Sequence, residues 1–462
     1  MKEHLQDEHL PTGRRKMSPL RIVSYAGFAV GASVLVCVLA LLLFPDPLVN
    51  SFVKPRMVEA FAEAYPAYSI YIADIKYSLL ENRFEFDSVA LSAVDGTFSG
   101  NMGRFSVSGI GWMHLLWGGS VAPNDFANSV VEAQDVVLNF APSQYELRCG
   151  LLHVSVPDSD IVVEALTLHP FGDDRQFFSG SQVRRTRHRL VIPHARAMGC
   201  ACLELLQGKN YRARSAHIHD AFLDILINKE KPFTKDTASP PMPNEILSWL
   251  KGTLQVDSLS ITNGRLEYGE RFAVGLKPAL ITLDSMQVLA EGITNHGDPG
   301  AALTIHAQGN FMKAGAMTVL MSIPVASPEF SLQYSGSLGR MDLHALNLFL
   351  EPAEQMRIVA GALQAATFEI NVASGRASGN VRAAYRDLTV AAINSHTGSD
   401  NGVVDNIAAF IANTFKIRGT NMPDKSGSMK IGEVNYTRQR DESFLTFTWF
   451  ALRSGVGDVV GF

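Results

Sequence analysis

Hydrophobic residues follow two different patterns along this chain of 462 residues. The segment Ile22–Phe44 contains no charged residue and no proline, and as a helix it would cross a hydrocarbon layer of about 30 Å. From Tyr68 onward, apolar and polar residues alternate in short runs separated by Gly, Asn, Asp and Pro, for example in Phe84–Asp87 and Asp135–Phe140. Such alternation is typical of antiparallel strands with one apolar face. The pattern therefore predicts a single N-terminal transmembrane helix followed by a mainly β body.

The apolar segment 22–44 predicts an uncleaved anchor rather than a signal peptide. It is longer than the apolar region of a signal peptide, which has about 7–15 residues, and no small-residue cleavage site follows it. Basic residues precede it, so the positive-inside rule places residues 1–21 in the cytoplasm as a tail and the body on the other side of the membrane. Within the anchor, which runs from Ile22 to Phe44, Gly27 and Gly31 have a GxxxG spacing that allows close helix packing, although chance is the favoured explanation.

Few helices are predicted in the body. Residues 45–66 have an apolar stripe and predict an amphipathic juxtamembrane helix, which rests on lipid headgroups or, as we favour, caps the first strands. Shorter helices are predicted at Asn244–Lys251, at Asp342–Phe349 with Asp342 as the N-cap, and at Val403–Phe415. The Pro- and Ser-rich segment 232–243 predicts a linker between two β-regions, 67–231 and 244–462.

A weak internal repeat links two parts of the body. Val256–Tyr268 aligns without a gap with Ala213–Ile225, and Asn263 and Asp220 occupy the same position in the alignment. We interpret each copy as a hairpin, in which a strand, a turn and a returning strand follow one another. Repeated hairpins predict a sheet that grows in one direction, and chance similarity among hairpins is the alternative.

Composition restricts the classes of function. A net charge of −5 gives no argument for nucleic acid as a partner. Three cysteines lie in the body, Cys149, Cys200 and Cys202, which is an odd number for an oxidising compartment. One disulfide from Cys149 to Cys200 or Cys202 is conceivable but has little support, and its state stays open.

Candidate chemical sites are weak. His217, His219 and Asp220 have metal-ligand side chains. Only His217 and His219 share one strand face and no third ligand is evident nearby, so we interpret them as a polar strand face and predict no metal. The basic run Arg184–Arg189 predicts a solvated hairpin tip in preference to a headgroup-binding patch. Neither a nucleophile elbow nor a Gly-rich phosphate loop after a strand is present. We therefore expect a protein without enzymatic activity or cofactor.

Four segments resemble the AsmA-like proteins of diderm bacteria, a family that includes the TamB-like and YhdP-like envelope proteins. The opening, SIYIADIKYSLLENRFEFDSVALS (Ser69–Ser92), looks like the start of the family's periplasmic sheet. The segment MPNEILSWLKGTLQVDSLSITNGRLEYGER (Met242–Arg271) is similar to a recurring segment of an uncharacterised AsmA-like group. Ala360–Val390 and Lys430–Phe462 resemble the end of that group, the latter its terminal strand pair.

The resemblance implies an elongated, curved antiparallel sheet that forms a β-taco-like groove with an apolar interior. It implies anchoring in the bacterial inner membrane with a periplasmic body, phospholipids as partners, and a role in phospholipid transport or outer-membrane homeostasis. The alternating pattern alone leaves open whether the apolar residues line a groove or fill a closed sandwich core. The lipid-groove candidates are Phe84, Phe86, Leu138, Phe140, Leu223, Ile225, Ile227, Leu332, Tyr334 and Phe447.

A second hypothesis is a scaffold that docks an outer-membrane or envelope partner through a free sheet edge. The edge strand predicted for this role is Phe444–Phe450, which could pair with an added strand. A body of roughly 20–25 strands would form a sheet about 100–120 Å long, which leaves the bridging of two membranes in doubt.

Overall fold

The computed structural model describes residues 45–111, 123–206, 208, 210–234, 239–250, 252–273, 276–296, 301–325, 329–393 and 417–461. The predicted anchor, Ile22–Phe44, and the helix predicted at Val403–Phe415 lie outside these residues. None of the helices formed by the described residues has the length and apolarity needed to cross a membrane.

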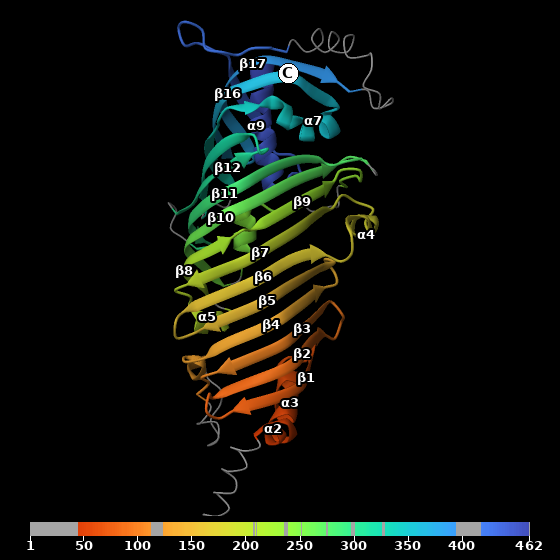
Figure 1. Cartoon of the computed structure of the whole chain (residues 1–462), viewed down its shortest axis with the longest axis vertical. Coiled ribbons are helices and arrows are strands. Elements are labelled where there is room, and N and C mark those ends of the chain that lie inside the picture. The colour runs from red at the N-terminus through yellow and green to blue at the C-terminus, as the bar shows by residue number, and fades with distance from the viewer. Residues whose placement is uncertain are drawn as a thin grey trace, which may run out of the picture.

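The described residues form one long, mostly antiparallel sheet of 18 strands with few helices (Figure 1). The strands succeed one another along the long axis of the molecule in the order of the sequence. They are β1 Tyr68–Ser78, β2 Arg83–Ala93, β3 Phe98–Ser108, β4 Val130–Phe140, β5 Tyr145–Ser155, β6 Asp160–Pro170, β7 Thr186–Met198, β8 Asn210–His219, β9 Phe222–Asn228, β10 Thr253–Arg271, β11 Ala279–Thr294, β12 Ala302–Phe311, β13 Gly315–Pro324, β14 Ser331–Leu338, β15 Met341–Asp342, β16 Met356–Ala373, β17 Arg376–Ala392 and β18 Ile431–Thr437.

The helices are short except for the last one. They are α2 Pro45–Leu48, the π-helix η1 Val49–Val53, α3 Lys54–Ala64, the 3-10 helix η3 Pro123–Phe126, α4 Asp174–Ser179, α5 Cys202–Leu206, α6 Pro243–Ser248, the 3-10 helix η4 Leu343–Leu346, α7 Asn347–Glu354 and α9 Phe444–Val460. The helices predicted at 244–251 and 342–349 are confirmed. As predicted, Asp342 caps its helix, because its Oδ1 accepts a hydrogen bond from the backbone N–H of His344 at 2.9 Å.

The N-terminal helices cover the free edge of β1, as the capping interpretation predicted. The carboxamide of Asn50 donates to the Ile75 carbonyl at 2.8 Å and accepts from the Ile75 N–H at 3.0 Å, as a neighbouring strand would. Asp46 accepts from the N–H of Tyr77 at 3.0 Å. Of the predicted apolar stripe, Val49 is buried against the sheet while Phe52 is 64% exposed. Edge strands protected in this way do not recruit further strands.

The internal repeat has a different meaning from the one predicted. Strand β10 is a single strand, not a hairpin, and it runs parallel to β8 and β9, which together form one broken strand. The residues aligned in the repeat are direct neighbours in the sheet: Ile261 pairs with Ile218, and Tyr268 pairs with Ile225. The hairpin interpretation is therefore wrong, because residues with φ near +55° interrupt these strands without reversing them. This junction also makes the sheet mixed rather than purely antiparallel.

A line of backbone irregularities, which we call the seam, crosses the sheet from β2 to β11. One residue within each of five strands has a left-handed backbone, and Asp220 has the same conformation in the gap between β8 and β9. The five are Ser88, Asp135, Ala165, Asn263 and Ser285. Pairing is interrupted at each of them, and the side chains of Asn263 and Asp220 hydrogen-bond across the seam at 2.5 Å. Such interruptions bend and twist strands.

The structure of the C-terminal segment contradicts the predicted edge strand. Phe444–Phe450 is the start of helix α9 and not an edge strand, so among the described strands the C-terminal edge of the sheet is β18.

The sheet formed by the described strands is also shorter than predicted. Strands β8 and β9 share one position and β14 and β15 another, so 18 strands fill sixteen positions, which span roughly 70 Å at a spacing of about 4.8 Å.

Candidate functional site

One face of the sheet carries apolar side chains from end to end. We call the face on which α7 and α9 pack the inner face, and the opposite face the outer face. Cross-strand neighbours share a face. The register therefore continues the inner face from Leu223 in β9 through Leu190 and Leu168 to Leu138 in β4. The nine strand candidates lie on this face; they are Phe84, Phe86, Leu138, Phe140, Leu223, Ile225, Ile227, Leu332 and Tyr334.

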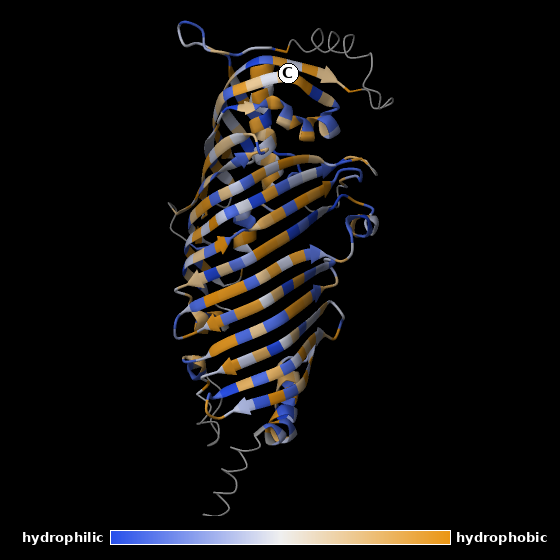
Figure 2. Ribbon diagram, in the orientation of Figure 1, coloured by the Kyte–Doolittle hydropathy of each residue, from blue (hydrophilic) through white to orange (hydrophobic). Residues whose placement is uncertain are grey.

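The inner face is only partly covered over β4 to β6. Leu138 and Phe140 of β4 and Leu166 and Leu168 of β6 are only half-buried, although they lie in the middle of the sheet. Among the described residues, strands β4–β6 do not form a hydrophobic cluster of buried residues of their own. Figure 2 shows the alternation of apolar and polar residues along these strands. A sandwich core would bury such side chains, so this stretch is an apolar surface without a covering layer.

Helix α9 covers the inner face of the C-terminal strands. It runs along the long axis behind β10 to β17 in the view of Figure 1 and packs on β17 and β18. Phe447 is fully buried, and Leu332 and Tyr334 beneath the helix are 1% and 4% exposed. The Tyr334 hydroxyl donates to the Thr448 carbonyl at 2.9 Å, and burial raises the pKa of this phenol. Phe447 is thus a core residue of a helix. The inner face at Leu332 and Tyr334 is covered by protein and offers no free surface there.

Helix α7 completes the cover together with α9. Phe349 of α7 is buried and meets Trp449 of α9 edge-to-face, with ring centroids 5.8 Å apart. Arg453 of α9 forms an ion pair with Glu354 of α7 at 2.7 Å. The inner face therefore changes along its length from an uncovered apolar surface to a layer closed by two helices.

A buried polar cluster marks the transition at β9 and β10. Glu270 is 1% exposed, accepts a hydrogen bond from the Tyr268 hydroxyl at 2.6 Å, and pairs with the Lys229 ammonium at 2.8 Å. The same hydroxyl lies 3.3 Å from Thr446 Oγ1 near the start of α9. Burial and the adjacent Glu270 carboxylate raise the pKa of Tyr268, so the phenol stays protonated and acts as a donor. This cluster ties the first turn of α9 to the sheet.

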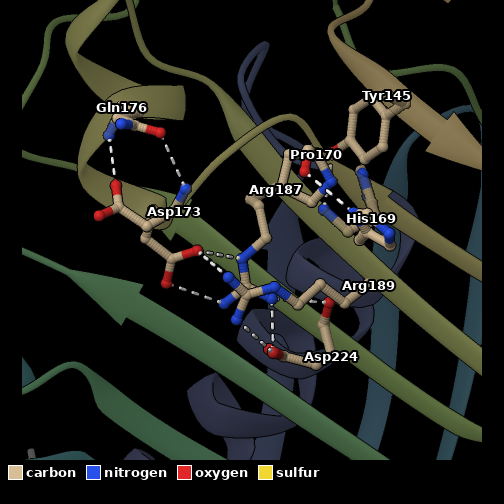
Figure 3. Close-up of polar contacts among 10 residues, drawn as sticks. Tyr145, His169, Pro170, Asp173, Gln176, Arg187, Arg189 and Asp224 are labelled. Carbon is tan, nitrogen blue, oxygen red and sulfur yellow. Dashed lines mark hydrogen bonds and ion pairs between the residues drawn. The ribbon is translucent and has the colours of Figure 1, made fainter. Parts of the chain in front are cut away.

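The basic run Arg184–Arg189 is not a solvated tip. Arg187 is 3% exposed, and its guanidinium contacts Asp174 of α4 at 3.2 Å and Asp224 of β9 at 2.5 Å (Figure 3). Arg189 joins the same two carboxylates, at 2.7 Å from Asp174 and 3.8 Å from Asp224. Arg184 pairs with Asp441. These charges are neutralised by carboxylates from the nearby helix α4, from β9 and from Asp441.

His217 and His219, which we interpret as part of a polar strand face, lie on β8 with polar partners. His217 Nδ1 is 2.7 Å from Ser260 Oγ, and His219 Nδ1 is 2.5 Å from Thr262 Oγ1. Within the described residues, no group of three His, Cys, Asp or Glu side chains could hold a metal ion.

The three cysteines of the body are free thiols. Cys149, Cys200 and Cys202 are buried, and none of them forms a disulfide in the structure. Burial raises the pKa of the Cys200 thiol to about 11, with a smaller contribution from the neighbouring Cys202. A protonated buried thiol is a poor nucleophile.

From the sequence we did not predict that residues 444–460 form a helix that covers the inner face of the sheet. The residues that the helix buries most deeply, Phe447, Ala451, Gly455 and Val459, recur every four positions, which is a helical spacing. Ser443, which caps the helix by accepting from the N–H of Thr446, was a second signal. The dense aromatic residues before Ala451 favour strand and obscured both.

Comparison with protein-family models and with curated proteins gives no match for this chain.

Proposed function

We propose that this protein holds lipid acyl chains on the uncovered part of its inner face and acts, without catalysis, in phospholipid transport or envelope homeostasis. The observation that carries the proposal is the half-buried apolar face of β4–β6, which no described helix covers and which is continuous by register with a buried core on either side. A folded domain leaves such a surface without cover mainly where it binds something apolar.

Acyl chains suit this surface because it offers many apolar contacts and few polar ones. Removing one methylene from water contributes about 0.8 kcal/mol, so a 16-carbon chain would gain on the order of 10 kcal/mol before ordering costs. The charged residues of these strands, such as Glu132 and Arg148, lie on the outer face, where Glu132 pairs with His153 at 3.2 Å and Arg148 pairs with Glu146. No nucleophile or base is needed for this role.

The proposed cellular setting follows from the sequence. The resemblance to AsmA-like proteins, together with the apolar segment 22–44, supports an inner-membrane anchor with a periplasmic body. The capping helices α2 to α3 begin directly after this segment, which would place the β1 end of the sheet beside the membrane. A described sheet of roughly 70 Å falls short of the longer sheets of that family, so a handover partner would be needed at the β18 end.

A photo-crosslinking experiment tests the proposal. A benzophenone amino acid at position 138, on the inner face of β4, should capture phospholipid in cells. The same group at position 137 is the control, because Val137 is half-buried like Leu138 on the same strand but points to the outer face. Mass spectrometry of the adducts gives the readout.

Equal lipid capture at both positions, or none at either, would contradict the proposal. Capture of a single protein at position 138 in place of lipid would instead support the scaffold hypothesis.

A further inference from the structure

A cavity of about 290 Å³ lies beneath α9 and is separate from the uncovered strands. Phe311, Val319 and Phe368 of the sheet line one side, while Leu452 and Val456 of α9 and Leu346 of η4 line the other. Its volume is about twice that of the engineered apolar cavity of roughly 150 Å³ that binds benzene. It lies at the lower end of the range of about 300–1,000 Å³ for small-molecule pockets.

The cavity offers almost no polar partner to a ligand. Both tyrosine hydroxyls at its wall are already used, Tyr334 toward the Thr448 carbonyl at 2.9 Å and Tyr268 toward Glu270 at 2.6 Å. The Trp449 indole N–H is the buried polar atom of the lining that lacks a partner among the described residues. A bound water needs two to four polar partners, so water gains little here and a hydrocarbon gains most.

Part of the cavity wall formed by α9 and η4 is accessible to solvent. Val456 lines the cavity and is also 40% exposed, and Leu346 on the other side is half-buried. One turn before Val456, Arg453 holds α9 to α7 through Glu354. This exposed part of the wall is the side from which a chain would enter while α9 stays on the sheet.

We propose that this cavity binds a single straight hydrocarbon chain, which is either the tail of a free fatty acid or one acyl chain of a phospholipid. Its size excludes both chains of a phospholipid together. The inference rests on the proposed function and deepens it, since it assigns a chain-binding chamber to the covered end of the inner face.

The test uses the full chain in phospholipid nanodiscs and dodecanoic acid with a terminal diazirine. Light should attach the probe to peptides of α9 and β13–β16, and excess unlabelled dodecanoic acid should suppress the attachment. Ala366→Phe places a ring in the cavity and should reduce labelling about tenfold, because at least two methylenes lose their site. Ala316→Phe, on the exposed outer face of β13 beside Met317, is the matched control and should label like the unchanged protein.

A second arm replaces the free acid by vesicles of phosphatidylethanolamine with a diazirine on one acyl chain. Labelling of the cavity in both arms shows that a phospholipid chain can enter, and labelling by the acid alone assigns the site to free chains. Absence of cavity labelling in both arms, or labelling that Ala366→Phe leaves unchanged, would overturn the inference. If lipid capture at position 138 persists in that case, the proposed function stands without the chamber.

Discussion

Glu442 is a carboxylic acid that the fold buries at the start of α9. It is 2% exposed, accepts a hydrogen bond from the Tyr436 hydroxyl, and accepts another from the Gln439 N–H at 2.9 Å. Burial raises its pKa, and the two hydrogen bonds oppose that shift only in part. A group whose folded pKa exceeds its unfolded pKa stabilises the fold below the unfolded value and loses this contribution as pH rises through the folded value.

Glu442→Gln should therefore change the pH dependence of stability. Across the pH interval that contains the raised folded pKa of Glu442, the unchanged protein loses the contribution of Glu442, whereas the amide, which cannot ionise, keeps a constant one. The free energy of unfolding of the unchanged protein should fall relative to that of Glu442→Gln over this interval. Denaturant unfolding at several pH values measures the difference, and parallel curves for the two proteins would contradict the assignment.

At the scale of elements, α9 decides how the C-terminal half is closed. The helix approaches the sheet closely because glycines face each other: a Cβ on Gly432 of β18 would lie 2.0 Å from the Gly455 carbonyl oxygen. A Cβ on Gly455 would lie 2.6 Å from Val381 Cγ2 and 2.7 Å from Val434 Cγ2. Contacts this short force the helix or the strands to move.

Gly455→Ala should destabilise the protein by about 1–3 kcal/mol through overpacking. The sign is informative, because the same change inside an exposed helix stabilises by about 1 kcal/mol. Ser454→Ala, one residue earlier and half-buried, is the control and should stay within about 0.5 kcal/mol of the unchanged protein. Thermal unfolding compares the variants, and a stabilising Gly455→Ala would show that α9 does not pack as described.

At the scale of the whole molecule, the seam shapes the sheet. Neighbouring seam positions contact each other across strands: a Cβ on Gly150 would lie 3.1 Å from Ala165 Cβ, and a Cβ on Gly103 would lie 3.1 Å from Asp135 Cβ. Bulge-like breaks that coincide from strand to strand bend a sheet along one line instead of twisting each strand separately. The inner face therefore owes part of its shape to seam residues that are small or polar.

Replacing alanine by glycine should change the free energy of unfolding in opposite directions at the seam and outside it. Ala165 has φ +52°, where a Cβ costs about 1–2 kcal/mol, so Ala165→Gly should stabilise by about 1 kcal/mol. Ala195 of the neighbouring strand β7 pairs regularly with Val163 of β6, outside the seam. Ala195→Gly should therefore destabilise by about 0.5–1 kcal/mol. Denaturant unfolding of both variants is the measurement. Destabilisation of similar size in both would mean that the seam is not strained at Ala165.

The sequence by itself determined the strands and the existence of one apolar face. Period-two alternation depends on neighbouring residues alone, so Leu138 and Phe140, Ile225 and Ile227, and Leu332 and Tyr334 could be assigned to one face. The helix cap at Asp342 was readable for the same reason, because the side chain bonds two residues away.

Only the tertiary structure decided which part of that face is covered. Leu138 and Leu332 have the same local pattern, yet one is only half-buried and the other is fully buried under α9, more than a hundred residues later in the chain. The contact of Arg187 with Asp224 and the pairing of Ile261 with Ile218 likewise join distant segments. Local periodicity states which side of a strand is apolar, but only packing between distant elements determines what lies against that side.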